Sequence, residues 1–397
     1  MALASLDSFS GFYYQPRLLA VVHLAALGWV GSSILGALGS LAPRVLRIDP
    51  TPGKGDGWAV TAWILGVVGL ASHMAIHEPY GLISSALCAV LGGGWFVGRF
   101  FRRLSGGRMP SGVRLGLRLA SANFFLATGL GLLMSIDKLI DVLPGDLLTP
   151  VAAHAHLAAL GWAVLTALSM AEVMLPMLLP AVPLARGFMA VALAVEAGAL
   201  AIALGIASGA GAFVGALLAA AGGLGFLLRI GWMLRRGLRP GPRRFRPNLA
   251  RAQALAAFAC FGVALGIGLA LARPGAPEES IRWAVAYGVF GLIGFLGQLV
   301  AAVAGELLPS ELWIRRFGAG QVPNPPPPLA WVSPPARWSA ALGLGLAAPL
   351  LALGSAFESS AAITAGAMVF LIGALGQGAS FVRLFRPPHD LVPADWG

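Results

Sequence analysis

A seven-residue pattern occurs three times in this chain, at a constant interval of about 133 residues, which is too long for a solenoid repeat and suits a helical bundle. The first two copies, HLAALGW, begin at His23 and His156, and the third, VFGLIGF, begins at Val289. A proline follows each copy at the same distance, at positions 43, 176 and 309. Three such periods fill a chain of 397 residues, so we interpret the protein as three fused helical units, residues 1–133, 134–266 and 267–397.

The composition predicts that these units lie in a membrane. Hydrophobic residues make up 58% of the chain and the mean hydropathy is +0.82, well above the values of an average soluble domain. Apolar runs long enough to cross a bilayer are predicted at 17–42, 58–76, 80–100, 113–138, 151–178, 185–207, 211–234, 250–272, 283–308, 337–356 and 360–384. We therefore expect an all-α polytopic membrane protein, with about eleven transmembrane helices in a single membrane domain, 1–397.

The positive charges predict an orientation. With the N-terminus outside, 23 of the 27 lysine and arginine residues fall on the cytoplasmic side. This bias sets the orientation of membrane proteins, and it predicts a multi-pass protein of the cell's inner membrane with its C-terminus in the cytoplasm. The net charge of +11 follows from these loops and does not indicate nucleic-acid binding, so the lipid bilayer is the first expected partner.

Five of the six histidines map to the outer third of the predicted membrane, whereas His389 lies in the C-terminal tail. The five are His23, His73, His77, His154 and His156. Ionisable side chains inside a membrane are costly and usually functional, which favours a cofactor or metal site near the outer face. The alternative for His23 and His156 is a hydrogen bond to neighbouring backbone that stabilises the contact between units.

The spacing of the paired histidines leads to two further predictions. His73 and His77 are four residues apart, which suits a metal ion shared on one helical face; alternatively His77 is a solvated loop residue, because an acidic residue and a proline follow it. His154 and His156 are two residues apart and diverge by roughly 200° around a helix. They are therefore expected to serve two different sites.

The three motif-bearing helices resemble those of subunit I of the haem–copper oxidases and nitric oxide reductases. The pattern His-x-x-x-Leu-Gly-Trp, running on to a proline, is similar to that of short, degenerate relatives such as the NnrS-like proteins, and the stretch 294–317 resembles the same helix in those relatives. The similarity spans the chain and is strong only in these three helices. Subunit I has twelve spans and begins inside the cell; without its first helix it would have the eleven spans, beginning outside, that are predicted here.

The resemblance implies haem b and copper as cofactors, with departures. His23 matches the family's first ligand to its low-spin haem. The opposing His-x-His belongs on the third motif-bearing helix, where this chain has Tyr287-Gly-Val, and the two adjacent histidines of the following helix are missing from the sixth span. The resemblance therefore implies that the complete oxygen-reduction site is absent. His-x-His occurs instead at 154 and 156, so the cofactor position is expected to have moved by one repeat.

The candidate ligands are unevenly distributed over the three copies. Equivalent positions 23, 156 and 289 read His, His and Val, and positions 21, 154 and 287 read Val, His and Tyr. If the three helices surround a threefold axis, the groove between the first two units has His23 on one side and either His154 or His156 on the other. The remaining histidine of this pair faces Tyr287. A haem with two histidine ligands is therefore expected between units one and two.

Two functions remain open from the sequence. The first is a membrane subunit that binds haem b or copper near the outer face and acts in respiratory electron transfer or nitric oxide handling, as an oxidoreductase if it is an enzyme. Cytochrome c-type or other respiratory subunits would be its partners. The alternative is a structural subunit of a respiratory complex, or a small-molecule transporter, that keeps the fold without the cofactors.

One carboxyl group is predicted near the middle of the membrane. Glu196 falls halfway along the sixth span, where a charge is most costly, so we expect it to be protonated or paired, with a role in a proton path left open. Glu172 lies 16 residues beyond His156, which is about 24 Å along a helix. Glu172 is therefore expected at the cytoplasmic end, away from the histidines.

The predicted orientation can be tested with a reporter. A fluorescent protein that matures only in the cytoplasm, fused after Gly397, should fluoresce, because the charge bias places the C-terminus inside. The same reporter on the N-terminus should stay dark. A dark C-terminal fusion that is correctly inserted would contradict the predicted orientation.

Overall fold

The computed structural model describes residues 14–146, 148–237, 248–275, 282–318, 325 and 327–385, and this part of the chain is helical, without strands. Its elements are α1 (Pro16–His23), η2 (Leu24–Gly31), α2 (Ser32–Leu46), α3 (Asp56–Ile76), α4 (Pro79–Arg103), η3 (Leu104–Gly106), α5 (Ser111–Ile140), α6 (Leu148–His156), η4 (Leu157–Val164), α7 (Leu165–Leu178), α8 (Phe188–Ala207), α9 (Phe213–Gly237), α10 (Leu249–Ala272), α11 (Arg282–Val289), η6 (Phe290–Gly297), α12 (Gln298–Phe317), η7 (Pro328–Trp331), α13 (Pro334–Ala356) and α14 (Ser360–Phe385).

The described residues contain eleven helices that are long and apolar enough to cross a membrane. Three of them are built from consecutive elements and carry the repeated pattern. We call them the first motif helix (α1–η2–α2), the second motif helix (α6–η4–α7) and the third motif helix (α11–η6–α12). The prediction of an all-α polytopic membrane protein with about eleven spans is confirmed, and most predicted span ends agree with the structure to within a few residues.

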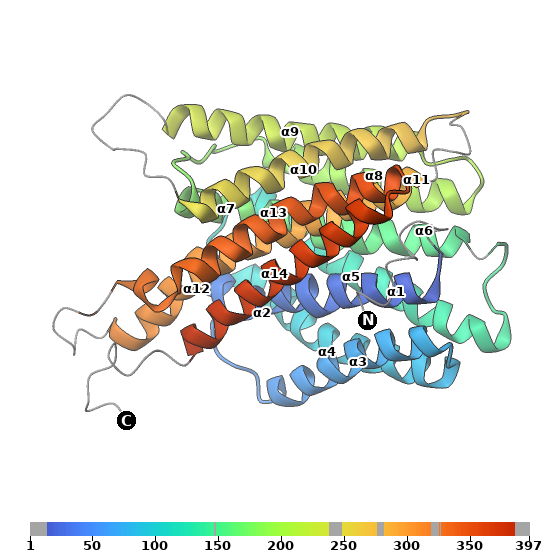
Figure 1. The fold of residues 1–397 in the computed structure, drawn as a ribbon, viewed down its shortest axis with the longest axis horizontal. Helices are drawn as coiled ribbons and strands as arrows, with labels where there is room; N and C mark the ends of the chain where they lie inside the picture. The colour runs from blue at the N-terminus through green and yellow to red at the C-terminus, as the bar shows by residue number, and fades with distance from the viewer. Residues whose placement is uncertain are drawn as a thin grey trace.

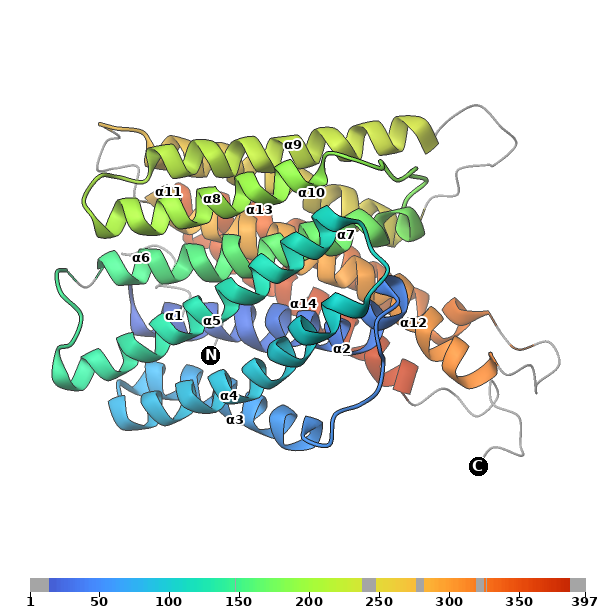
Figure 2. The same cartoon turned by 180° about the vertical axis from the view of Figure 1, so that it is seen from behind.

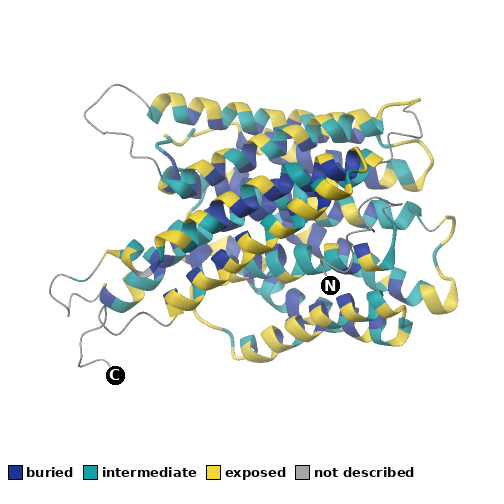
Figure 3. Cartoon of the chain, in the orientation of Figure 1, coloured by how far each residue is buried: buried dark blue, intermediate teal, exposed yellow. Residues whose placement is uncertain are grey.

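The spans run side by side along the long axis of the molecule (Figures 1 and 2). The elements α1, α6 and α11 lie at one end and α2, α7 and α12 at the other, so the three motif helices run in the same direction. Buried residues concentrate in the middle of the bundle, while the outward faces of the peripheral helices are exposed (Figure 3). The second motif helix is the most enclosed, with 78% of its most apolar window buried, against 33% for α3.

Each motif helix contains an eight-residue π-helical segment at the same place. The segments η2, η4 and η6 begin at residues 24, 157 and 290, each directly after the first position of the repeated pattern. π-Helical turns are rare and frequently occur at functional sites. Directly after η2, the Ser32 hydroxyl donates to the Leu27 carbonyl of η2 at 3.0 Å, and the Trp63 indole N–H donates to the Ser32 hydroxyl at 2.9 Å. The neighbouring helix α3 therefore supports this wide turn.

The motif helices contact one another through a tryptophan placed against a glycine. Trp162 lies against Gly31, where an added Cβ would come within 3.3 Å of the indole ring. Trp29 lies against Gly297 in the same way, and a Cβ added at Gly297 would come within 2.6 Å of the Trp29 ring. The two contacts use equivalent positions of the repeated pattern. The tryptophans, 29 and 162, each end a copy of the pattern. The glycines, 31 and 297, each end a π-helical segment. Small residues allow transmembrane helices to approach this closely.

Ion pairs fasten the end of the bundle that carries α2, α7 and α12, which we call the arginine-rich end. Glu172 of α7 pairs with Arg229 of α9. Glu311 of α12 pairs with Arg44 of α2 at 2.9 Å and with Arg315 at 2.7 Å. The side chains of both glutamates are only 5% exposed. Removing Arg229 would therefore leave the buried charge of Glu172 uncompensated.

The contact between Trp29 and Gly297 gives a prediction about stability. Gly297→Ala should cost roughly 1–3 kcal/mol of unfolding free energy, because its Cβ would overlap the large Trp29 ring. Gly291→Ala, in the same π-helical segment, is the matched control and should be close to neutral, since no atom lies within 4 Å of its added Cβ. Thermal unfolding of the purified proteins followed by tryptophan fluorescence measures both. Equal midpoints would contradict the packing described here.

Candidate cofactor site

Two histidines from different motif helices face each other near one end of the bundle. The rings of His23 in α1 and His154 in α6 have centroids 6.4 Å apart and planes that differ by 14°. Both side chains are partly buried. The sequence leaves open whether His154 or His156 faces His23, and the structure places His154 there.

The hydrogen bonds of these rings leave one nitrogen of each available. The Nδ1 atom of His23 lies 2.8 Å from the Leu19 carbonyl oxygen, and Nδ1 of His154 lies 2.9 Å from that of Ala127. A carbonyl only accepts, so a neutral ring donates its Nδ1–H and keeps its lone pair on Nε2. Histidines that bind metals are commonly held in this way. The sequence offers a backbone hydrogen bond as the alternative to a ligand role for His23. His23 makes this bond through Nδ1, and its Nε2 can still bind a metal.

The position of His154 depends on α5. The Ala127 carbonyl of α5 fixes the ring through Nδ1, and Gly131, one turn further along α5, makes room for it. A Cβ at Gly131 would lie 2.9 Å from Cε1 of His154. Neither residue is distinctive in an apolar helix rich in glycine and alanine, so sequence reasoning did not find them.

A second contact of the same type joins His156 and Tyr287. Their ring centroids are 6.2 Å apart and their planes differ by 24°. The Nδ1 atom of His156 lies 2.8 Å from the Ala152 carbonyl oxygen, which repeats the bond of His23 to Leu19 one unit later in the chain. Adding the interval of 133 residues to His23 and His154 gives His156 and Tyr287, so the two pairs occupy equivalent positions of the repeated pattern. The rings of His154 and His156 therefore contact two different motif helices, in agreement with the divergence that their spacing predicts.

The proposed metal pair on α3 does not have the predicted geometry. Helix α3 ends at Ile76, and His77 has a left-handed backbone with φ of 59° and an exposed side chain. Pro79 begins the next helix and prevents α3 from continuing. His73 lies 3.2 Å from the Ser85 hydroxyl. The expectation that His73 and His77 share a helical face is therefore wrong, and His77 is the exposed residue of the alternative.

Groups of three or more metal-binding side chains do not occur among the described residues, and His389 lies outside them. The two facing pairs, His23 with His154 and His156 with Tyr287, are thus the candidate site that the structure offers.

Glu196 lies on α8, a helix that packs against α6. Its side chain is buried, and the Asn123 amide donates a hydrogen bond to it at 2.6 Å. Asn123 also packs against Gly161 of η4, where an added Cβ would lie 2.6 Å from its Cγ. Glu196 is therefore hydrogen-bonded, as expected of a paired group, while its protonation stays a prediction. Asn123 is a further polar residue that sequence reasoning missed.

Glu172 lies where the sequence places it, at the arginine-rich end. Besides pairing with Glu172, Arg229 donates to the carbonyl oxygen of Arg186 at 2.5 Å. This network fixes the end of the second motif helix opposite to the histidines.

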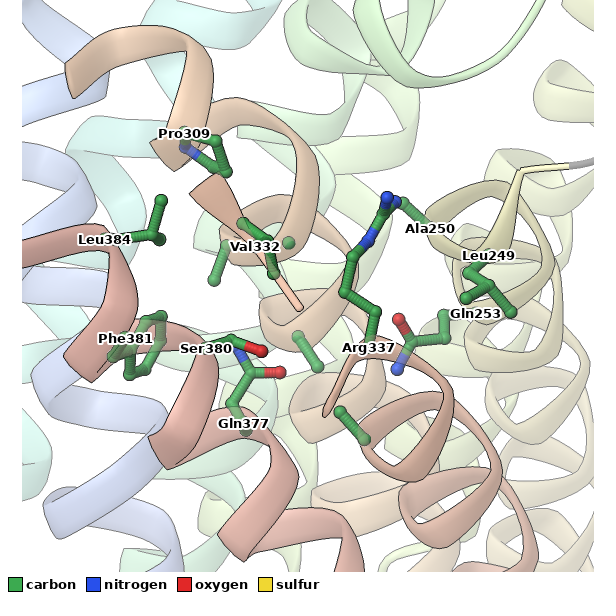
Figure 4. Close-up of a pocket in the computed structure, with 14 residues that line it drawn as sticks. Leu249, Ala250, Gln253, Pro309, Val332, Arg337, Gln377, Ser380, Phe381 and Leu384 are labelled. Carbon is green, nitrogen blue, oxygen red and sulfur yellow. The ribbon is translucent and has the colours of Figure 1, made fainter. Parts of the chain in front are cut away.

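A small cavity of about 20 Å³ lies between α10, α12, α13 and α14 (Figure 4). Arg337, Gln253 and Gln377 are among its polar lining residues. The cavity reaches α12 at Ala301 and Pro309, which are 12 and 20 residues beyond Val289, or about 18 and 30 Å along a helix. It is therefore separate from the histidines.

Comparison with known proteins gives no family assignment, because no protein-family model matches the chain and no curated protein is a significant match.

The two buried glutamates should respond differently to neutralisation. Glu196→Gln should leave stability nearly unchanged, because a glutamine can still accept the hydrogen bond from Asn123 and an uncharged group is expected at this depth. Glu172→Gln should cost about 3–5 kcal/mol, because Arg229 would lose its charged partner. Thermal unfolding of both variants tests this. A large loss in Glu196→Gln would mean that Glu196 is ionised and paired.

Proposed function

We propose that this protein binds haem b between its first and second motif helices, where His23 and His154 would hold the iron. The observation that carries the proposal is the facing pair of rings with free Nε2 atoms. Two imidazoles that bind one ion from opposite sides, each at about 2 Å as in zinc sites, have centroids roughly 6 Å apart. The separation of 6.4 Å fits this arrangement.

The chemistry of the pair also fits a haem. His23 and His154 would supply two imidazoles, and the porphyrin would supply the remaining ligands of the iron. Backbone carbonyls fix both rings through Nδ1, so the protein loses little conformational entropy when it orders them on binding. When bound, a haem held by two histidines supplies one-electron transfer.

The second groove offers a weaker ligand set. His156 faces a tyrosine instead of a second histidine, and Tyr287 could ligate or donate a hydrogen bond to a group held by His156. Copper is the alternative cofactor for these histidines. Neither arrangement reproduces the complete oxygen-reduction site of the family that the sequence resembles, so oxygen reduction is not proposed.

The proposed role is a membrane subunit, similar to subunit I of the haem–copper oxidases, in respiratory electron transfer or nitric oxide handling. The charge bias supports an inner-membrane location with the N-terminus outside, which puts the histidine pairs near the outer face. Electrons would then be exchanged with a cytochrome c-type or other respiratory subunit on that side.

The proposal predicts the absorption spectrum of the purified protein and of its histidine variants. The full-length protein purified with haem b should have a Soret band and the sharp reduced bands of iron with two histidine ligands. His23→Ala and His154→Ala should each abolish or shift these bands, since each removes one axial ligand. His73→Ala is the control, because the ring of His73 bonds to the Ser85 hydroxyl and not to either histidine of the pair, and its spectrum should be unchanged.

The result that would overturn the proposal is equally definite. If the wild-type protein binds neither haem nor copper, or if both histidine variants keep the wild-type spectrum, the site assignment is wrong. A colourless, metal-free protein would support the alternative of a structural subunit or transporter on the same fold.

A further inference from the structure

The small cavity at the arginine-rich end contains a buried amide group that the rest of the structure leaves without a partner. Gln253 of α10 is 7% exposed, and its Nε2 atom has no hydrogen-bond partner. Its side chain extends from α10 into the cavity, and the amide points towards Arg337 of α13 (Figure 4). A buried N–H donor without an acceptor is costly, so Gln253 indicates that the cavity holds a group that accepts a hydrogen bond.

The cavity has room for one small polar group and is lined mainly by donors. Its volume of about 20 Å³ exceeds the roughly 10–15 Å³ that one ordered water needs. Gln377 and Ser380 of α14 line it on the side facing Gln253 and Arg337 (Figure 4). Arginine carries donors only, and a glutamine amide supplies further N–H groups. A group with several acceptor oxygens therefore fits this lining best.

Arg337 supplies a positive charge to the cavity. Its Nη2 atom lies 3.6 Å from Oε2 of Glu306, and that oxygen also accepts a hydrogen bond from the Asn248 amide at 3.0 Å. A guanidinium carries several N–H donors, so this long contact leaves donors of Arg337 for a second acceptor. The cavity also lies at the first turns of α10 and α13, whose N-terminal ends carry partial positive charge. The combination favours an anion.

The place of the cavity along the spans favours a lipid as the source of that anion. Its lining comes from the first turns of α10 and α13 and the last turns of α14, where the headgroups of a bilayer are expected. Leu249 and Phe381 give it apolar walls, and Arg251 and Arg383 are chain neighbours of lining residues. Basic pockets between transmembrane helices on the cytoplasmic side bind anionic lipid headgroups.

We propose that this cavity binds a phosphate oxygen of an anionic phospholipid, with Nε2 of Gln253 and the guanidinium of Arg337 as hydrogen-bond donors. The acyl chains leave the site past apolar lining residues such as Phe381. Inorganic phosphate offers the same oxygens without acyl chains, and a water molecule would satisfy Gln253 without any charge. The site lies at the end of the bundle opposite to the histidines, so the inference does not rest on the proposed haem.

The wild-type protein tests which ligand the cavity takes. The full-length chain is freed of lipid in a non-ionic detergent, and native mass spectrometry measures the fraction that retains phosphatidylglycerol as its concentration rises. Phosphatidylcholine has the same phosphodiester without net charge and should bind roughly tenfold more weakly, because it gains less from the arginines. Inorganic phosphate at the same concentration should not displace phosphatidylglycerol.

Gln253→Leu tests the buried donor. It should weaken phosphatidylglycerol binding about tenfold, the loss expected when a hydrogen bond to a charged acceptor is removed. It should not lower the unfolding midpoint of the lipid-free protein, because it removes a buried amide N–H that has no partner. Gln298→Leu is the matched control. Gln298 is 1% exposed, both of its amide atoms lack a partner, and it does not line the cavity, so lipid binding should be unchanged.

Arg337→Gln tests the charge and should also weaken phosphatidylglycerol binding about tenfold. Arg102→Gln removes one positive charge from an exposed position of α4 that does not line the cavity. Its affinity for phosphatidylglycerol should equal that of the wild type, which separates a contact in the site from a change in net charge.

Three results would overturn the inference. If the wild type retains no phosphatidylglycerol, or if Gln253→Leu binds it as tightly as the wild type, the cavity holds water only. If phosphatidylcholine binds equally well, the site does not select an anion. If inorganic phosphate displaces the lipid at equal concentration, the ligand is a free anion. The assay contains no haem, so none of these results decides the proposed function.

Discussion

The close packing of the three motif helices against one another is the constraint on which the rest of the molecule depends. The contact of Trp162 with Gly31 joins the second helix to the first, that of His156 with Tyr287 joins the second to the third, and that of Trp29 with Gly297 joins the first to the third. Each helix thus contacts both others. Without a hydrophobic drive in lipid, such packing of rings into glycine gaps is a main source of helix association.

This arrangement explains how similar contacts can produce different sites. One ring contact occurs twice at equivalent positions. His23 of the first motif helix contacts His154 of the second, and His156 of the second contacts Tyr287 of the third. The remaining equivalents are Val289 and Val21, which cannot bind a cofactor. The side chains alone therefore decide that one groove offers two imidazoles, another one imidazole and a phenol, and the last none.

The sequence was sufficient to predict the spans, because membrane crossing requires long apolar runs and little else resembles them. It also predicted that His154 and His156 face different grooves, since that follows from helix geometry. It could not choose which of them faces His23. That choice depends on how the helices are rotated, and each π-helical segment adds residues to a turn and changes the rotation beyond it. The repeat of whole units along the chain stays a prediction.

The misses have a common physical origin. Spacing alone places His77 on a helical face, but the helix ends one residue earlier, where Pro79 and the cap formed by Glu78 start α4. Asn123 packs against Gly161, and Gly131 makes room for the ring of His154. Such residues carry no periodic signal of their own. Only tertiary contacts distinguish Asn123 from any other polar residue in an apolar span.

The two ends of the motif helices differ in the forces that hold them. At the arginine-rich end, Glu172 and Glu311 fix the helices by buried ion pairs. At the histidine end, ring contacts and hydrogen bonds from ring nitrogens to carbonyls hold the helices. An ion pair beside the histidines would impose a fixed charge on any bound metal. The buried ion pairs of Glu172 and Glu311 therefore lie at the opposite end of the motif helices from the two facing ring pairs.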